Sequence, residues 1–209
     1  MTVLAIDRST AVQSVALAVK GELRRAERCE ASWIAGVRDF LKMNGVEPCG
    51  LDRIVVGMGP GSFAGIRGAL SFAQGLALGI KAKRTQLASA PVVHGLQSAL
   101  SAVREGELVA VVGDARRDLF WVSAYEGVRT VTALRLATKE ELPSAVPTGA
   151  LVVTPDNARI GATLGEMFGG RFAGERLPDA GRMLRIAAAH PELLTPEPLP
   201  IYLSPAVRA

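Results

Sequence analysis

The sequence has 209 residues and a mass of 21.9 kDa, enough for one large domain or two small lobes. Hydrophobic residues make up 49% of the chain and glycine occurs 22 times, which is typical of a packed α/β protein and excludes a disordered one. The formal net charge of +4 is too mild to demand a nucleic-acid partner, although it permits contact with RNA or an acidic protein.

The cysteines and the apolar segments of the sequence indicate the cellular compartment in which the protein is found. Cys29 and Cys49 form neither a disulfide framework nor a zinc-binding spacing, and we interpret them as reduced thiols. Asp7 and Arg8 interrupt the first apolar run, so we expect no signal peptide. The most apolar stretch, residues 66–80, is shorter than the ~20 residues of a membrane span and contains an arginine. The sequence therefore predicts a cytoplasmic protein that does not associate with membranes.

Apolar periodicity and turn residues predict the order of secondary structure. Strands are expected at residues 2–6, 12–19, 23–29, 53–58, 85–88, 107–113, 119–125, 128–136 and 151–153. Helices are expected from Ser32 to Asn44 and at residues 63–81, 92–103, 156–167 and 179–190, with a proline-rich tail at residues 191–205. The order of strand, aspartate turn, strand, strand occurs around Asp7 and again around Asp114. We interpret this weak repeat as two related lobes, residues 1–104 and 105–209.

Residues 55–67 are the most informative stretch of the chain. A buried strand runs into Gly59-Pro60-Gly61 and then into a long apolar helix, the order in which α/β proteins present backbone N–H groups to an anion or a partner. The turn has no lysine, which excludes a P-loop. A dinucleotide fold is excluded because Gly65 follows Gly61 by four residues and no acidic residue follows about 20 residues later. We expect Ser62 to cap the helix.

Residues 57–67, Gly-Met-Gly-Pro-Gly-Ser-Phe-Ala-Gly-Ile-Arg, resemble the TsaB (YeaZ) family signature Gly-x-Gly-Pro-Gly-Ser-Phe-Thr-Gly-x-Arg. Further segments similar to that family are Leu4-Ala5-Ile6-Asp7-Arg8-Ser9-Thr10, Asp114-Ala115-Arg116-Arg117 with Phe120-Trp121, and Pro200-Ile201-Tyr202-Leu203. Ala64 stands where the signature has threonine, and two further features depart from the family pattern. Arg8 replaces a threonine, and the His-Ser-Glu motif at the start of the first helix is absent.

The resemblance implies an actin-like (ASKHA, ribonuclease H-like) α/β fold with two lobes, each with a mixed sheet and helices. It also implies a non-catalytic subunit in the synthesis of threonylcarbamoyladenosine at position 37 of tRNA, which binds and supports the TsaD catalytic subunit through N-lobe helices. A TsaE ATPase would join the complex, tRNA contact would occur only within it, and the protein alone would form a homodimer. The alternative is a small ATP-dependent kinase or ATPase of the same fold.

Candidate catalytic groups are few. Asp7 and Asp114 are the best candidates for phosphate or magnesium chemistry, but neither has a glycine after it, and we favour a role in which each caps its turn through its own backbone. His94, expected inside a helix, and His190 form no metal-binding pair, and no serine-hydrolase motif is present, which argues against the glycoprotease activity sometimes attributed to the family. We therefore predict no catalytic, cofactor-binding or metal site.

The helix at residues 63–81 offers a surface instead. Each of its interior glycines costs up to ~1 kcal/mol relative to alanine, so another backbone should approach it closely. It is apolar almost all round and is therefore buried on more than one face, either inside the chain or against a second protein. The resemblance favours the second protein. We predict an interface formed by Trp33, Val37, Phe40, Leu41, Ile66, Leu70, Ala73, Ala77 and Ile80, beside a signature loop formed by Gly57, Gly59, Pro60, Gly61, Ser62, Phe63, Gly65 and Arg67.

Overall fold

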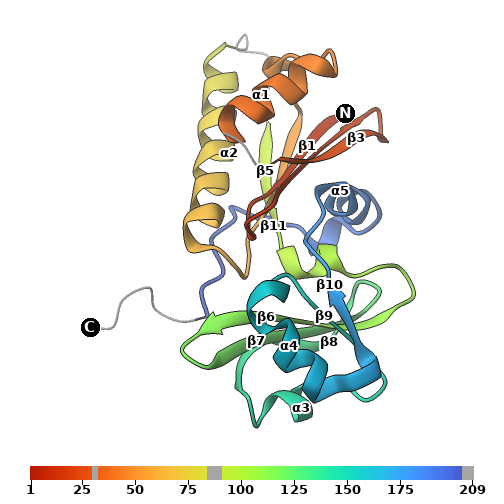
Figure 1. Cartoon of the computed structure of the whole chain (residues 1–209). Coiled ribbons are helices and arrows are strands. Elements are labelled where there is room, and N and C mark those ends of the chain that lie inside the picture. The colour runs from red at the N-terminus through yellow and green to blue at the C-terminus, as the bar shows by residue number, and fades with distance from the viewer. Residues whose placement is uncertain (30–32, 84–90, 204–209) are drawn as a thin grey trace. The chain divides into compact units, whose positions relative to one another are not determined.

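The computed structural model describes residues 1–29, 33–83 and 91–203, which form two compact units (Figure 1). Unit 1 contains Met1–Ser98 and Asp179–Pro200, and unit 2 contains Ala99–Pro178 and the chain from Ile201 onward. Each unit has its own sheet with helices, as the sequence predicts for two lobes.

Unit 1 is built on a six-stranded sheet in the order β11-β5-β4-β1-β2-β3. Strand β1 pairs with β2 in antiparallel and with β4 in parallel orientation, and β4 pairs with β5 in parallel orientation. The elements are β1 (Thr2–Asp7), β2 (Gln13–Val19), β3 (Glu22–Cys29), α1 (Trp33–Met43), η1 (Pro48–Gly50), β4 (Arg53–Gly57), α2 (Phe63–Lys83), β5 (Val92–Leu96), α5 (Ala180–Ala189), η4 (Pro191–Leu193) and β11 (Thr195–Pro196).

Helices lie on both sides of the unit 1 sheet because successive side chains of a strand point to opposite faces. Leu4 and Ile6 of β1 belong to the core that α1 and α2 complete. Ser14 of β2 accepts a hydrogen bond from the Ala180 N–H at the start of α5, at 2.9 Å. Strand β1 is therefore buried along nearly its whole length.

Unit 2 has a five-stranded sheet in the order β10-β9-β6-β7-β8, with α3 and α4 packed on one face of it. Strands β6, β7 and β8 form an antiparallel meander, whereas β9 runs parallel to both β6 and β10. The elements are η2 (Ser98–Ala102), which begins at the last residue of unit 1, β6 (Leu108–Arg116), β7 (Leu119–Glu126), β8 (Arg129–Thr138), α3 (Leu142–Ala145), β9 (Leu151–Thr154), α4 (Asn157–Phe168), η3 (Gly169–Arg171) and β10 (Phe172–Glu175).

One predicted helix is wrong. Residues 92–103 form strand β5 followed by the short helix η2 rather than one long helix. Val92 and Val93 are β-branched, and the backbone groups of this run complete the parallel ladder with β4. A short apolar run cannot be assigned by periodicity alone, and here the neighbouring strand decided it. The predicted strand at residues 85–88 and the predicted helix start at Ser32 lie outside the described residues.

The last helix, α5, belongs to unit 1. Residues 179–190 were expected in the C-terminal lobe, but α5 packs against β1 and β2 of unit 1. Met183 and Ile186 are buried there, and Asp179 caps the helix by accepting from the Arg182 N–H at 2.7 Å. The proline-rich tail then adds β11 to the sheet edge, where proline is tolerated.

Among the described residues, one helix is long and apolar enough to cross a membrane by length and composition, at residues Phe63–Lys81 of α2. The helix is longer than the 15-residue apolar stretch considered above. Its buried side packs on the sheet of unit 1, as a core helix does, so length and hydropathy do not by themselves indicate a span.

Candidate functional site

The signature loop joins β4 to α2 and packs tightly against the turn after β1. A Cβ added at Gly57 would overlap the Asp7 carboxylate, and one added at Gly61 would overlap the Ser9 carbonyl oxygen. The Ser62 N–H donates to that carbonyl at 2.7 Å. Gly61 also has φ of 148°, which other residues rarely adopt. The loop glycines therefore allow two backbone segments to touch.

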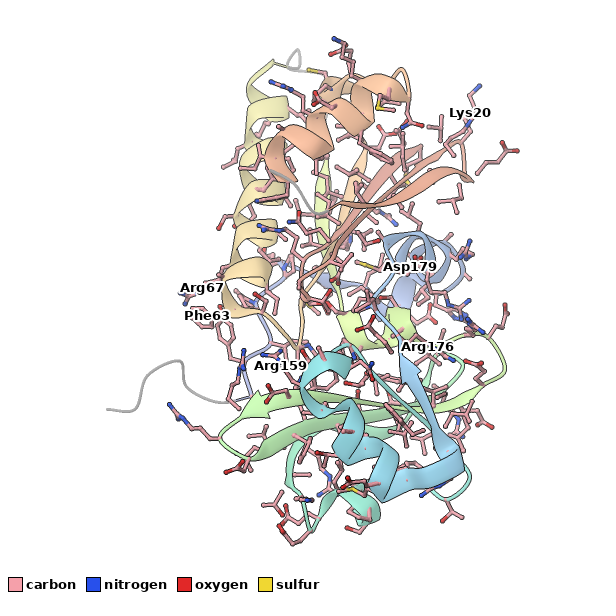
Figure 2. All side chains as sticks on the ribbon, viewed as in Figure 1. Lys20, Phe63, Arg67, Arg159, Arg176 and Asp179 are labelled. Carbon is pink, nitrogen blue, oxygen red and sulfur yellow. The ribbon has the colours of Figure 1, made fainter. Side chains whose placement is uncertain are left out.

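The loop also fixes where α2 begins. The Gly65 N–H donates to the Ser62 hydroxyl oxygen at 3.2 Å, which confirms Ser62 as the N-cap. Phe63 and Arg67 lie together on the first turn of α2, with the Arg67 guanidinium 4.0 Å from the centre of the Phe63 ring (Figure 2). Both side chains reach the surface.

Asp7 is a buried carboxylate inside unit 1. Its Oδ1 accepts hydrogen bonds from the Ser9 N–H at 2.9 Å and from the Ser9 hydroxyl at 2.6 Å. Only 1% of the residue is exposed. Burial raises the pKa of Asp7, although hydrogen bonds from Ser9 and Ser98 oppose that rise. The predicted role of Asp7 as a turn cap is confirmed, and its carboxylate faces its own unit.

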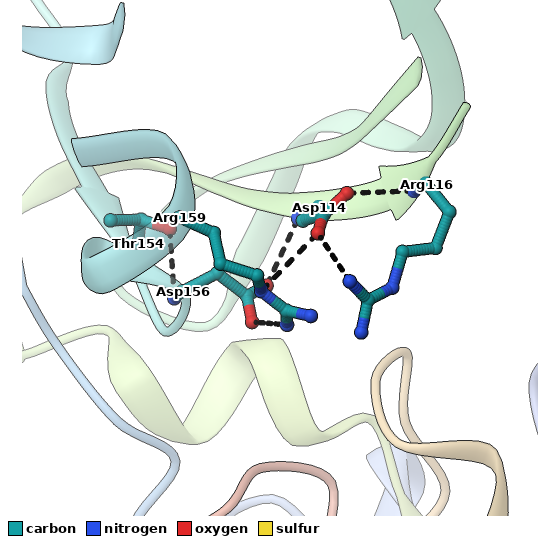
Figure 3. Close-up of polar contacts among 5 residues, drawn as sticks. All are labelled: Asp114, Arg116, Thr154, Asp156 and Arg159. Atoms are coloured by element: carbon teal, nitrogen blue, oxygen red, sulfur yellow. Dashed lines mark hydrogen bonds and ion pairs between the residues drawn. The ribbon is translucent and has the colours of Figure 1, made fainter. Parts of the chain in front are cut away.

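Asp114 at the end of β6 is held by two arginines of unit 2 (Figure 3). Its Oδ1 accepts from the Arg116 N–H at 2.7 Å, which confirms the turn-capping role. Its Oδ2 lies 3.2 Å from Nε of Arg159 and 3.4 Å from Nη1 of Arg116. Arg159 also pairs with Asp156, which accepts a bond from the Asp114 N–H at 2.9 Å. The negative charge of Asp114 is thus balanced within the unit.

Arg159 and Asp156 were not singled out by sequence reasoning. Their spacing of three residues at the start of a helix was the available signal, because it places the two side chains on one face of α4. Only the pairing of β6 with β9 brings them to Asp114.

The two histidines do not form a metal site. His94 lies on β5, not in a helix as expected, and burial together with the charge of Arg53 lowers its pKa. His190 follows α5, with Nδ1 3.2 Å from the Glu192 carboxylate. No group of three or more His, Cys, Asp or Glu side chains suited to a metal ion occurs among the described residues.

Most of the predicted interface residues lie in the core of unit 1. Eight of the nine are less than 10% exposed, and Trp33 alone is half-buried. The stripe recurring every three or four residues is the side of each helix that meets the sheet. These eight side chains are buried in the described structure of unit 1: Val37, Phe40, Leu41, Ile66, Leu70, Ala73, Ala77 and Ile80.

The opposite side of α2 is exposed and was missed. We call Ser71, Gly75, Leu78 and Gly79 the exposed helix face. Leu78 is 67% exposed, and a Cβ added at Gly75 or Gly79 would meet no atom of the described chain within 4 Å. No internal contact therefore explains these two glycines. The members of the exposed helix face recur every three or four residues, offset from the buried stripe, and that spacing was the signal available in the sequence. On neighbouring α1, Ile34 is 56% exposed.

The other α2 glycines have an internal explanation in Arg8. A Cβ at Gly65 would overlap the Arg8 carbonyl oxygen, and one at Gly68 would lie 2.9 Å from Arg8 Nη1. The Arg8 guanidinium stacks on Trp33, with Cζ 4.3 Å from the ring centre. The Trp33 ring meets Phe72 of α2 edge-on, with ring centres 4.7 Å apart. Arg8 thus links the β1 turn to both helices.

Known proteins resemble this chain in sequence and structure. Residues 26–143 match the family described as TsaD: tRNA N6-adenosine threonylcarbamoyltransferase. An uncharacterized protein of Mycobacterium tuberculosis is 28% identical over 175 residues, 76% of this chain and 75% of that one. The tRNA threonylcarbamoyladenosine biosynthesis proteins TsaB of Haemophilus influenzae and Escherichia coli are 39% and 38% identical over 84 residues, 38% of this chain and 36% of each relative. The structure of YeaZ from Pseudomonas aeruginosa matches with a TM-score of 0.74 and 27% identity, covering 97% of this chain and 99% of that one.

The two mixed sheets with their helices, together with the match to YeaZ along almost the whole chain, confirm the actin-like α/β fold. The family match covers more than half of the chain. The protein belongs to this tRNA N6-adenosine threonylcarbamoyltransferase family, in its TsaB (YeaZ) branch.

Proposed function

We propose that this protein is a non-catalytic subunit in the synthesis of threonylcarbamoyladenosine at position 37 of tRNA, where it binds and supports a TsaD-type catalytic subunit. Membership of the TsaB branch and the names of its curated relatives support the pathway. The observation that carries the role of a binding subunit is the exposed helix face, with an apolar Leu78 between two glycines that no internal packing explains.

The aspartate turns support a non-catalytic role. A two-lobed ATPase of this fold uses such aspartates for phosphate or magnesium. Here the Asp7 carboxylate is buried and bonded to Ser9, and the Asp114 carboxylate is paired with Arg116 and Arg159. If the Asp7 carboxylate left Ser9, a buried acceptor would lose its hydrogen bonds. If the Asp114 carboxylate left its two arginines, charged groups would lose their partners.

The proposed docking surface is the exposed helix face. Glycines there let the backbone of a partner helix approach α2 closely, and Leu78 supplies apolar contact area. In the absence of the catalytic subunit, we propose that the same face joins two copies of this chain. A TsaE-type ATPase and tRNA would be contacted only in the assembled complex, in the cytoplasm.

The test is association of the purified protein with the TsaD-type subunit of its own organism, followed by sedimentation. Gly75→Trp should weaken association about 5- to 150-fold, the effect of ~1–3 kcal/mol of overpacking at a tight contact. Gly170→Trp, which fills open space in unit 2, is the matched control. Circular dichroism checks folding. If Gly75→Trp is folded and associates as the parent does, the docking surface lies elsewhere.

The alternative, a small ATP-dependent kinase or ATPase, makes a different prediction for the isolated protein. Calorimetric titration with magnesium-ATP should show weak or no binding if the protein is non-catalytic. Micromolar affinity would favour the kinase or ATPase and count against the proposed role.

A further inference from the structure

The chain that follows η4 runs along the edge of unit 1 and is anchored there at two positions. Leu194 and Pro198 are buried, whereas the three residues between them and Leu199 beyond them are exposed. Strand β11 lies in this run and pairs with the edge of β5 (Figure 1). We call residues 195–198 the strap.

The second anchor, Pro198, packs beside a residue of the signature segment. A Cβ added at Gly95 of β5 would overlap both Met58 Sδ and Pro198 Cβ. The absence of a side chain at Gly95 therefore lets the strap and the signature segment come together over β5. Met58 follows Gly57 of the signature loop and is 8% exposed. Its flexible thioether suits the irregular space between a strand and a proline ring.

The backbone of the signature loop is bonded to the same end of β5. The Met58 N–H donates to the Leu96 carbonyl oxygen at 2.9 Å, and the Gly59 N–H donates to the Ser98 hydroxyl oxygen at 3.0 Å. The Ser98 N–H donates in turn to the Gly59 carbonyl oxygen at 2.9 Å. The strap thus covers the part of the sheet to which the loop is attached.

Few of the described interactions hold the strap itself. Its ladder with β5 is two residues long, and Pro196 has no N–H to contribute to it. Glu197 has φ of 53°, a left-handed conformation that is unfavourable for a residue with a side chain. Burial of Pro198 has to offset that cost. A segment held by so few buried contacts opens locally at a lower free energy than the whole unit.

We propose that the strap is a conformational device that controls the signature loop. With Pro198 seated beside Met58, the loop is held in the form that begins α2 at Phe63. With the strap released, Met58 loses its cover, and the loop loosens together with the first turn of α2, which the Ser62 hydroxyl caps. The device is a property of this chain alone and does not depend on the proposed function.

Amide hydrogen exchange of the isolated protein at increasing urea concentration tests whether the strap and the loop open locally. The amides to follow are those of Met58, Gly59, Ser62 and Gly65, whose hydrogen bonds lie in the loop and at the start of α2. They should exchange faster than amides at the centre of β1 and β4, and with little dependence on urea, because a local opening exposes little surface. Exchange of all four only through global unfolding would overturn the proposal.

A substitution at the anchor tests whether the strap controls this opening. Pro198→Asp removes the apolar contact and places a charge beside Met58. It should make the four amides exchange about 10-fold faster, while amides at the centre of β1 and β4 keep the rates of the parent. Leu199→Asp is the matched control, because it adds the same charge at a side chain that is 75% exposed and should leave all the rates unchanged. Circular dichroism checks folding.

Pro198→Ala, which removes most of the ring without adding a charge, serves if Pro198→Asp does not fold. It should speed exchange of the same four amides by a smaller factor. A folded variant with parent rates at Met58 and Gly59 would show that the strap does not hold the loop. Faster exchange at Met58 and Gly59 with parent rates at Ser62 and Gly65 would also overturn the proposal, because the strap would then not control the start of α2.

Discussion

The turns that follow Asp7 and Asp114 have the same hydrogen-bond pattern, but the two carboxylates lie in different electrostatic surroundings. Asp7 and Asp114 each accept the N–H two residues further on. Asp7 is buried with neutral hydroxyl partners, whereas Asp114 stays near the surface with two arginines. The two turns therefore hold their carboxylates in different surroundings, one among neutral hydroxyl groups and one beside two cations.

Asp7→Asn tests the burial of the first aspartate. Because burial raises the pKa of Asp7 in the folded state, the folded protein holds that proton more tightly than the unfolded chain, whose pKa is near 3.8. The contribution of Asp7 to stability therefore falls as pH rises above about 3.8. The free energy of unfolding of Asp7→Asn, minus that of the parent, should grow with pH over this range. Urea unfolding at a series of pH values measures it, and a difference independent of pH would contradict the prediction.

At the scale of elements, α2 contains glycines of two kinds. Gly65 and Gly68 are crowded by Arg8, whereas Gly75 and Gly79 face open space in the described structure. The first pair is needed for the fold of unit 1. The second pair weakens an isolated helix without an internal benefit, which is the pattern expected where a partner comes close.

Alanine substitutions separate the two kinds. Gly75→Ala and Gly79→Ala should each raise the free energy of unfolding by about 0.5–1 kcal/mol, because an exposed helical glycine is less favourable than alanine. Gly65→Ala should lower it by about 1–3 kcal/mol, because the new methyl group would overlap the Arg8 carbonyl oxygen. Urea unfolding of the purified variants gives all three values. Equal effects at Gly65 and Gly75 would show that crowding does not distinguish them.

At the scale of the whole molecule, the chain leaves unit 1 after Ser98 and returns at Asp179 to complete it. The returning helix α5 covers the sheet face opposite to α1 and α2, so both faces of β1 depend on segments distant in sequence. The folding of unit 1 is therefore tied to residues beyond the predicted lobe boundary at 104.

Substitutions in α5 test this dependence. Ile186→Ala should destabilise the protein by about 2–5 kcal/mol, since Ile186 is 2% exposed, and Arg185→Ala on the exposed side should change stability by less than about 0.5 kcal/mol. Amide hydrogen exchange should show lost protection in β1 and β2 before β6 and β7. Loss confined to unit 2 would contradict the assignment of α5.

The sequence by itself determined the features that depend on local pattern. Short apolar runs bounded by turn residues defined β1, β2, β6 and β7 to within three residues of their observed ends. Ser62 was identified as a cap because its hydroxyl needs only a neighbouring N–H. The signature at residues 57–67 indicated the family. Its pattern is recognisable in the sequence because Gly57 and Gly61 lie against the turn after β1, where a side chain would not fit.

Tertiary structure alone decided the features that depend on distant partners. Residues 92–96 form a strand because their backbone groups pair with β4. Helix α5 belongs to unit 1 because it packs on β1 and β2. Arg159 contacts Asp114 only because the sheet brings their two segments together. The same applies to α2, which is apolar nearly all round. The sequence pattern shows that several faces of such a helix could be buried, but it does not show which face packs on the sheet. Packing placed Ala73 and Ala77 inside and left Gly75 and Leu78 outside, because only the complete sheet fixes the rotation of the helix about its axis.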